Sequence, residues 1–150
     1  MFYRYRFESD IYPELSRIPL AVRMKLDLTG AKISLKAWLV FSLEEREALC
    51  RLPVETEEEK KAFLSLLDFL SHRYFGEKAA LAPPITDRPW EDSGRIPESV
   101  QAKCKETGQA VTLEEWRRWD RCRRYALCKL SLSKNEPEKF YQALKEFRDA

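Results

Sequence analysis

Apolar residues recur three and four positions apart along much of the chain, which is the spacing that places side chains on one face of a helix. The clearest runs are Phe63, Leu66, Leu67 and Leu70, followed near the end by Tyr141, Leu144 and Phe147. Strands would instead show strict alternation over several residues. The pattern therefore predicts a mainly helical protein made of several short helices.

Capping residues mark where these helices begin. In a capping box, a Ser or Thr side chain accepts the backbone N–H of the residue three positions on. A Glu at that later position accepts the backbone N–H of the Ser or Thr. Candidate pairs are Ser42 with Glu45, Thr56 with Glu59, Thr112 with Glu115, and Asn135 with Glu138. Ser34 and Asp120 are further N-cap candidates, and Pro53 is expected to end the helix that begins after Ser42.

The same order of residues occurs twice. The stretch from Arg17 to Phe69 aligns without gaps on the stretch 95–147, at an offset of 78, and 18 of the 53 aligned pairs are identical. Proline (Pro19 and Pro97), glycine (Gly30 and Gly108) and tryptophan recur at matching places. Proline suits the first turn of a helix and glycine suits its left-handed end. We therefore expect an all-α fold of two tandem copies of a multi-helix module.

The repeat sets the expected domain organisation. Residues 17–75 form the first helical repeat and 95–150 the second, while 76–94 are rich in proline and turn-forming residues and are expected to be a linker. Residues 1–16 form an N-terminal extension, in which aromatic residues alternate with arginine. That alternation favours a short N-terminal strand over Tyr3, Tyr5 and Phe7.

Composition narrows the class of protein. Hydrophobic residues make up 44% of the chain and charged residues 35%, so the chain is too apolar for a disordered segment. The net charge of +2 gives no overall field toward nucleic acid. No apolar run is long enough to span a membrane, and the first ten residues lack the apolar core of a signal peptide. We therefore expect a cytoplasmic protein with no membrane contact.

Catalytic and metal-binding groups are scarce. The four cysteines are Cys50, Cys104, Cys122 and Cys128, without any CxxC pair, and His72 is the only histidine. Ordinary zinc-ligand spacing and a histidine-activated nucleophile are therefore both lacking. We expect reduced thiols, no metal, no cofactor and no enzymatic activity. Trp38, Trp116, Cys50 and Cys128 occupy matching places in the repeats and are expected to pack in the core.

The most unusual segment is WRRWDRCRRY, Trp116 to Tyr125, in which five arginines are interleaved with aromatic residues. The aligned segment of the first repeat is apolar and then acidic, so a shared fold does not require these arginines. They form either an ordinary charged helix surface or a contact with a protein or cofactor; nucleic acid is the least favoured partner. The partner-binding candidates are Arg117, Arg118, Arg121, Arg123 and Arg124, with a second candidate surface at Arg17, Arg23 and Lys25.

Several segments resemble the nitrate reductase associated protein family. In the first half these are FESD from Phe7, RIPLAVRMKLD from Arg17, GAKISL from Gly30, Trp38 and EER from Glu44; in the second half they are IPESV from Ile96, Trp116, YALCKL from Tyr125 and ALKEF from Ala143. The resemblance extends over nearly the whole chain. It implies an accessory protein of assimilatory nitrate reduction and supplies no agreed catalytic residues.

The residues favour a protein without a catalytic centre. The resemblance then implies an assembly or maturation factor for a molybdenum-containing nitrate reductase or another molybdoenzyme, which would hold the enzyme or its anionic pterin cofactor. The alternative is a small regulatory or nucleic-acid-binding helical protein that uses the arginines of the second repeat. An enzyme of another kind ranks third. Phosphate-backbone binding weakens steeply with salt, whereas a packed protein interface does not, so salt dependence separates the first two.

Overall fold

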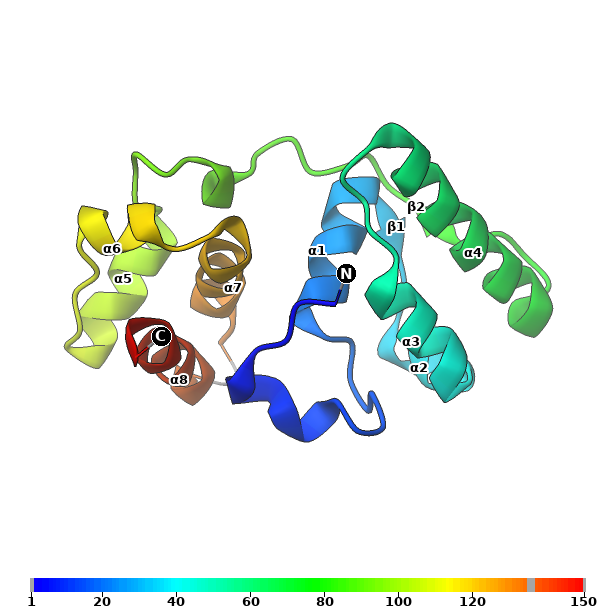
Figure 1. The fold of residues 1–150 in the computed structure, drawn as a ribbon, viewed down its shortest axis with the longest axis horizontal. Helices are drawn as coiled ribbons and strands as arrows, with labels where there is room; N and C mark the ends of the chain where they lie inside the picture. The colour runs from blue at the N-terminus through cyan, green and yellow to red at the C-terminus, as the bar shows by residue number, and fades with distance from the viewer. Residues whose placement is uncertain (1, 135–136, 150) are drawn as a thin grey trace. The chain divides into compact units, whose positions relative to one another are not determined.

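The computed structural model describes residues 2–134 and 137–149, and it is mainly helical (Figure 1), as the spacing of apolar residues predicts. The chain divides into two compact units. The first consists of Met1–Arg4 and Glu8–Thr86, and the second of Tyr5–Phe7 and Asp87–Ala150. Among the described residues, none of the helices combines the length and the apolar character that crossing a membrane requires.

The first unit is a group of helices closed by a very short sheet. Its helices are α1 (Leu20–Thr29), α2 (Leu35–Val40), α3 (Leu43–Arg51) and α4 (Glu57–Phe75). Helix α1 packs on α3, and α3 packs on α4. Strand β1 (Ala31–Lys32) pairs antiparallel with β2 (Ala80–Leu81), so a segment expected to be linker is held against the end of α1.

The second unit is centred on one helix. Its elements are the 3-10 turn η2 (Pro89–Glu91) and the helices α5 (Glu98–Thr107), α6 (Leu113–Arg118), α7 (Arg121–Leu132) and α8 (Pro137–Asp149). Helix α7 packs against α5, α8 and η2. Its central residues, from Tyr125 to Cys128, are all buried.

The predicted N-terminal strand is wrong. Residues 2–5 have no regular secondary structure, and the 3-10 helix η1 (Arg6–Ile11) follows, interrupted at Glu8. The backbone N–H groups of Arg6 and Phe7 donate to the carboxylate of Glu146, at 3.1 and 2.8 Å, instead of to a neighbouring strand. Tyr5 is buried, and its hydroxyl donates to the carbonyl of Cys122 at 2.7 Å. The aromatic residues therefore alternate because of packing, not because of a β-ladder.

The predicted helix starts are confirmed wherever the structure describes them. Ser42, Thr56 and Thr112 each form a complete capping box with the Glu three residues on. Ser34 and Asp120 also cap their helices by accepting a backbone N–H. Pro19 and Pro97 stand at the N-cap, one position before the first turn. Asn135 lies outside the described residues.

Corresponding helices of the two units share their bounds. Helices α1 and α5 begin and end 78 residues apart, as do α2 and α6, and α3 and α7 begin at the same offset. The ends of the last pair differ, because α3 stops at Arg51 before Pro53 whereas α7 continues through Ser131, the aligned residue. A proline lacks the N–H that would continue the helix.

Each unit buries a tryptophan at the aligned position in its apolar core. Trp38 and Trp116 have no exposed surface, as the core interpretation predicts. Helix α4 buries Phe63, Leu67 and Leu70. In α8 the buried face consists of Phe140, Ala143, Leu144 and Phe147. The prediction for Tyr141 is therefore wrong: it is 45% exposed, because its neighbour Phe140 takes the inward position.

Candidate functional site

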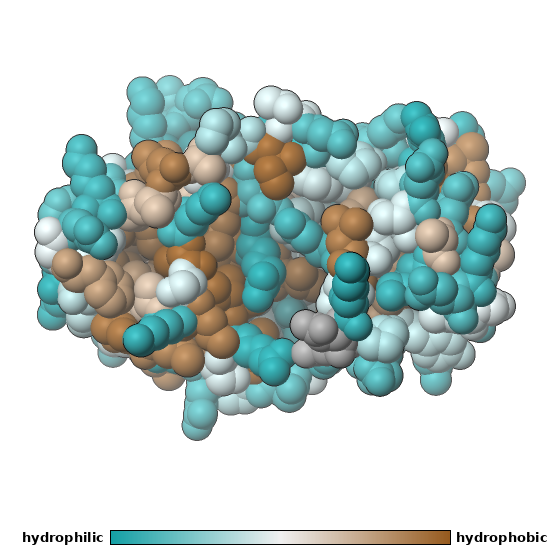
Figure 2. Space-filling view, turned by 180° about the vertical axis from the view of Figure 1, so that it is seen from behind, coloured by the Kyte–Doolittle hydropathy of each residue, from teal (hydrophilic) through white to brown (hydrophobic). Residues whose placement is uncertain are grey.

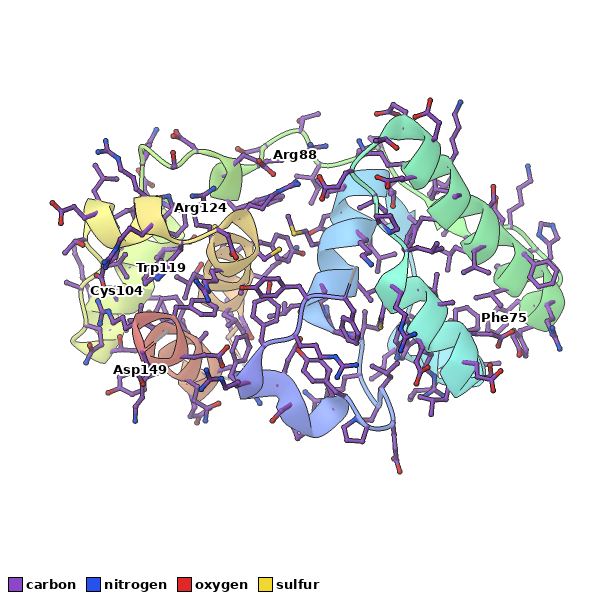
Figure 3. The ribbon with its side chains drawn as sticks, in the orientation of Figure 1. Phe75, Arg88, Cys104, Trp119, Arg124 and Asp149 are labelled. Atoms are coloured by element: carbon purple, nitrogen blue, oxygen red, sulfur yellow. The ribbon has the colours of Figure 1, made fainter. Side chains whose placement is uncertain are left out.

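The arginine-rich segment begins in α6, crosses the short connection at Trp119 and Asp120, and continues into α7. Asp120 caps α7 by accepting the N–H of Arg123 at 2.8 Å, which fixes how the two helices join. Trp119 is buried and donates its indole N–H to the carbonyl of Phe147 at 3.3 Å. Trp116 and Tyr125 are fully buried as well, and Figure 3 shows Trp119 within the second unit. The arginines of the segment, together with Asp120 and Cys122, are at least partly exposed.

Arg124 is used by the fold. Its Nε donates to the carbonyl of Trp90 at 2.7 Å, and its Nη1 donates to that of Trp119 at 2.8 Å. In the first unit the aligned residue, Arg46, likewise donates to the carbonyl of Phe41, the counterpart of Trp119, at 3.1 Å. Each guanidinium donates to carbonyls that have no hydrogen-bond partner within a helix, at the connection between two helices. Arg124 is therefore a structural residue instead of a surface contact.

In the first unit, Trp38 and Arg46 together hold the loop that contains Leu15. Leu15 has a left-handed backbone with φ of 48°, which is unusual for a residue other than glycine. Its carbonyl accepts the indole N–H of Trp38 at 2.8 Å and Nη1 of Arg46 at 3.5 Å. In the second unit Trp116 similarly donates to the carbonyl of Asp92 at 2.9 Å. Both tryptophans thus serve the core and also fix an incoming loop.

Arg121 and Arg123 are partly used. Arg121 forms an ion pair with Glu91 of η2 at 2.7 Å, and both side chains are partly exposed. The guanidinium of Arg123 lies 5.9 Å from the centre of the Phe147 ring, within cation–π range. Both side chains are held at the surface of the second unit by contacts within it. They can border an interface, but part of each guanidinium's bonding capacity is already used within the unit.

Arg117 and Arg118 lie in the last turn of α6, where both are exposed. Trp116 anchors the same helix, so the two guanidinium groups extend from a fixed backbone. A cation in the last turn of a helix is also favoured by the helix dipole. Of the five arginines in the segment, these two contribute least to the fold.

Lys25 does not belong to the second candidate surface. Arg17 and Arg23 are exposed, but Lys25 is only 6% exposed. Its ammonium group donates to the carbonyls of Leu49 and Cys50 in the last turn of α3. Lys25 therefore satisfies the carbonyls at the end of α3 inside the first unit. Arg17 and Arg23 remain as surface candidates.

Another arginine, which sequence reasoning missed, organises the second unit. Arg148 donates from Nε to Glu115 at 2.7 Å, from Nη1 to Gln109 at 3.2 Å, and to the carbonyl of Ala110. This hydrogen bonding lowers the pKa of Glu115 and raises that of Arg148. Its partners are 33 to 39 residues away, so no local pattern could reveal them.

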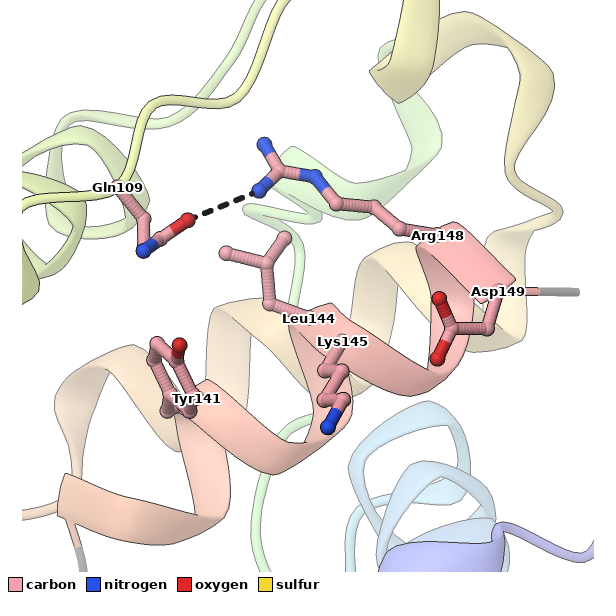
Figure 4. Close-up of a pocket in the computed structure, with 6 residues that line it drawn as sticks. All are labelled: Gln109, Tyr141, Leu144, Lys145, Arg148 and Asp149. Atoms are coloured by element: carbon pink, nitrogen blue, oxygen red, sulfur yellow. Dashed lines mark hydrogen bonds between the residues drawn. The ribbon is translucent and has the colours of Figure 1, made fainter.

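A shallow pocket of about 200 Å³ lies beside this arginine (Figure 4). It is lined by Gln109, Tyr141, Leu144, Lys145, Arg148 and Asp149. Its central cation is already neutralised by Glu115, with which Arg148 forms an ion pair at 2.7 Å. The charged groups of the lining that remain are Lys145 and Asp149, which have opposite signs.

Three of the four thiols are poorly suited to chemistry. None of the four cysteines forms a disulfide in the described part of the chain, and Cys50, Cys104 and Cys128 are buried. Burial raises the pKa of Cys50 and of Cys128 to about 12, and it also raises the pKa of Cys104. These three remain protonated at neutral pH, and a protonated thiol is a weak nucleophile and a poor metal ligand. Within residues 2–134 and 137–149, no group of three or more His, Cys, Asp or Glu side chains is placed to hold a metal ion.

The fold and these contacts define a small helical protein in which most of the unusual charged residues support packing and a pair of arginines on α6 stays exposed. The chain belongs to the conserved nitrate reductase-associated protein family, whose model matches residues 4–147, nearly the whole chain. No curated protein and no solved structure matches it. The resemblance seen in its sequence segments is therefore confirmed at the level of the family.

Proposed function

We propose that this protein is a non-catalytic accessory factor that binds a molybdenum-containing nitrate reductase in the cytoplasm and assists its assembly or maturation. The family supports an association with nitrate reductase. The burial of three thiols, with raised pKa values, supports a binding role over a catalytic one.

The observation that carries the proposal is the exposure of Arg117 and Arg118 on a helix fixed by a buried tryptophan. The aligned residues of the first unit, Leu39 and Val40, lie on a helix of the same length, so that helix forms without the arginines. Two guanidinium groups on adjacent residues can each bind a carboxylate or a phosphate through two hydrogen bonds. The ligand chemistry they fit is an acidic patch of the reductase or the phosphate of its pterin cofactor.

Binding to purified nitrate reductase tests this role. We expect the double variant Arg117→Ala with Arg118→Ala to weaken binding by about 2 kcal/mol, the usual cost of losing a hot-spot arginine. Its stability should change by no more than about 0.5 kcal/mol per substitution, because both side chains are exposed. The matched control is Arg17→Ala with Arg23→Ala, which removes two exposed arginines of the first unit. Greater loss in that control would place the interface there and contradict the proposal.

The dependence of binding on salt distinguishes a nucleic-acid partner from a protein partner. Binding to a phosphate backbone through many cations weakens steeply as salt is raised, whereas a packed protein interface is affected much less. The two exposed arginines of α6 form a small cationic footprint compared with the several contacts usual for nucleic acid. We therefore expect only a modest loss of reductase binding between low and moderate salt.

We also propose that the two units are copies of one module that later diverged in surface chemistry. The shared bounds of α1 with α5 and of α2 with α6 support this, as do the two equivalent buried tryptophans. An experimental structure should superpose residues 17–69 on 95–147. A structure in which Trp38 and Trp116 have unlike surroundings would contradict the proposal.

A further inference from the structure

Helix α2 of the first unit is apolar on both sides. Its inward residue is Trp38, which is fully buried, yet Leu35, Leu39 and Val40 are 44–45% exposed on its outer side. Leu43, at the start of α3, extends this surface and is 40% exposed. Large apolar side chains that are exposed together on one side of a helix mark a surface for an interaction. We call the surface formed by Leu35, Leu39, Val40 and Leu43 the α2 strip.

The first unit carries most of the large apolar side chains that the described residues expose. Seven of them, each 40–64% exposed, belong to the first unit, and three belong to the second. Figure 2 shows hydrophobic side chains gathered over the first unit, at the left of that view. Phe75 at the end of α4 is one of the seven, and its ring lies 6.4 Å from Phe41, which directly follows α2. Such a concentration of exposed apolar area marks an interaction surface.

Opposite charges stand at the two ends of the α2 strip. Lys36 lies in the first turn of α2, Glu44 lies in the first turn of α3, and both are exposed. In a twofold dimer the same patch faces itself, and when the axis runs across the strip each end meets the other end of its copy. Lys36 of one protomer would then face Glu44 of its partner, twice per interface. The strip is thus complementary to itself in charge as well as in polarity.

The second unit has charged residues where the α2 strip has apolar ones. Arg117 and Arg118 replace Leu39 and Val40, and Arg121 replaces Leu43. Facing copies of that surface would place like charges together, which opposes association. We propose that the protein forms a twofold dimer in which the α2 strip of the first unit packs against the α2 strip of a second copy. The interface uses none of the arginines assigned to reductase binding.

The oligomeric state of the full chain tests the dimer. We expect sedimentation equilibrium to show a concentration-dependent dimer, and the double variant Leu39→Arg with Val40→Arg to raise its dissociation constant about tenfold or more. This variant gives the first unit the residues found at the aligned positions of the second. The matched control, Leu132→Arg, changes a leucine that is 66% exposed in the second unit, and it should leave the dimer unchanged.

Charge reversal tests the twofold pairing itself without altering the apolar surface. Lys36→Glu and Glu44→Lys should each weaken the dimer several-fold, because each creates like-charge pairs across the interface. The two reversals combined should restore it. A chain that stays monomeric at all concentrations, or a dimer unaffected by the arginine substitutions, would overturn the proposal. Failure of the double reversal to restore association would overturn the twofold arrangement.

Discussion

Replacing Gly30 with alanine should destabilise the protein by about 3 kcal/mol, because backbone strain adds to a direct collision. Gly30 ends α1 with φ of 82°, a left-handed conformation that costs a residue with a Cβ roughly 1–2 kcal/mol. A Cβ at this position would also lie 2.1 Å from the carbonyl oxygen of Ala82. That contact cannot relax easily, since the N–H of Ala82 donates to the carbonyl of Gly30 at 2.7 Å.

Alanine variants of two other glycines measure the cost of the left-handed backbone without the steric clash. Gly76, in the same unit, and Gly108, at the aligned position of the second unit, have φ of 72° and 71°, and a Cβ at either would meet nothing within 4 Å. Alanine at either should therefore cost only the strain of roughly 1–2 kcal/mol. The free energies of unfolding of the three variants in urea give the comparison. Equal losses for all three would show that the pairing of β1 with β2 does not hold Gly30 close.

Replacing Lys25 with methionine should cost about 2 kcal/mol, because two buried carbonyls lose their donor. Leu49 and Cys50, whose carbonyls it bonds, have no exposed surface, so water cannot readily take its place. Pro53 explains the need for this lysine. The carbonyl of Leu49 would normally accept the N–H four residues on, and that residue is a proline.

Lys103, the aligned lysine of the second unit, is the matched control. There α7 continues past the corresponding carbonyls to Leu132, and Lys103 instead forms an i,i+3 ion pair with Glu106 at 3.3 Å. Such a pair stabilises a helix by only about 0.2–0.5 kcal/mol. Lys103→Met should therefore have a small effect. Urea unfolding that showed equal losses for Lys25→Met and Lys103→Met would contradict the assignment of Lys25 to the end of α3.

Short-range chemistry made much of the fold predictable. The capping boxes of Ser42, Thr56 and Thr112 act within four residues, so the sequence shows both partners side by side. Gly30 and Gly108 are similarly local, because a left-handed helix end is a property of one residue. The same holds for Pro53, whose missing N–H ends a helix regardless of its tertiary surroundings.

Long-range partners account for what the sequence could not predict. Lys25 was expected at a surface, but its carbonyl partners are 24 and 25 residues away and become relevant only because α3 ends early. Arg124 was grouped with the exposed arginines, yet it bonds to Trp90, 34 residues earlier. The backbone N–H groups of Arg6 and Phe7 donate to Glu146, 140 and 139 residues away, and the hydroxyl of Tyr5 donates to Cys122, 117 residues away. No pattern of spacing identifies such partners in advance.

Activation of the reductase tests the accessory role most directly. Purified apo-nitrate reductase would be loaded with its molybdenum cofactor in the presence and absence of this protein, and nitrate reduction would be followed over time. We predict a larger active fraction with the wild-type chain, a smaller gain with the Arg117→Ala, Arg118→Ala variant, and no nitrate reduction by the chain alone. Equal activation with and without the chain, or nitrate reduction by the chain alone, would contradict the account.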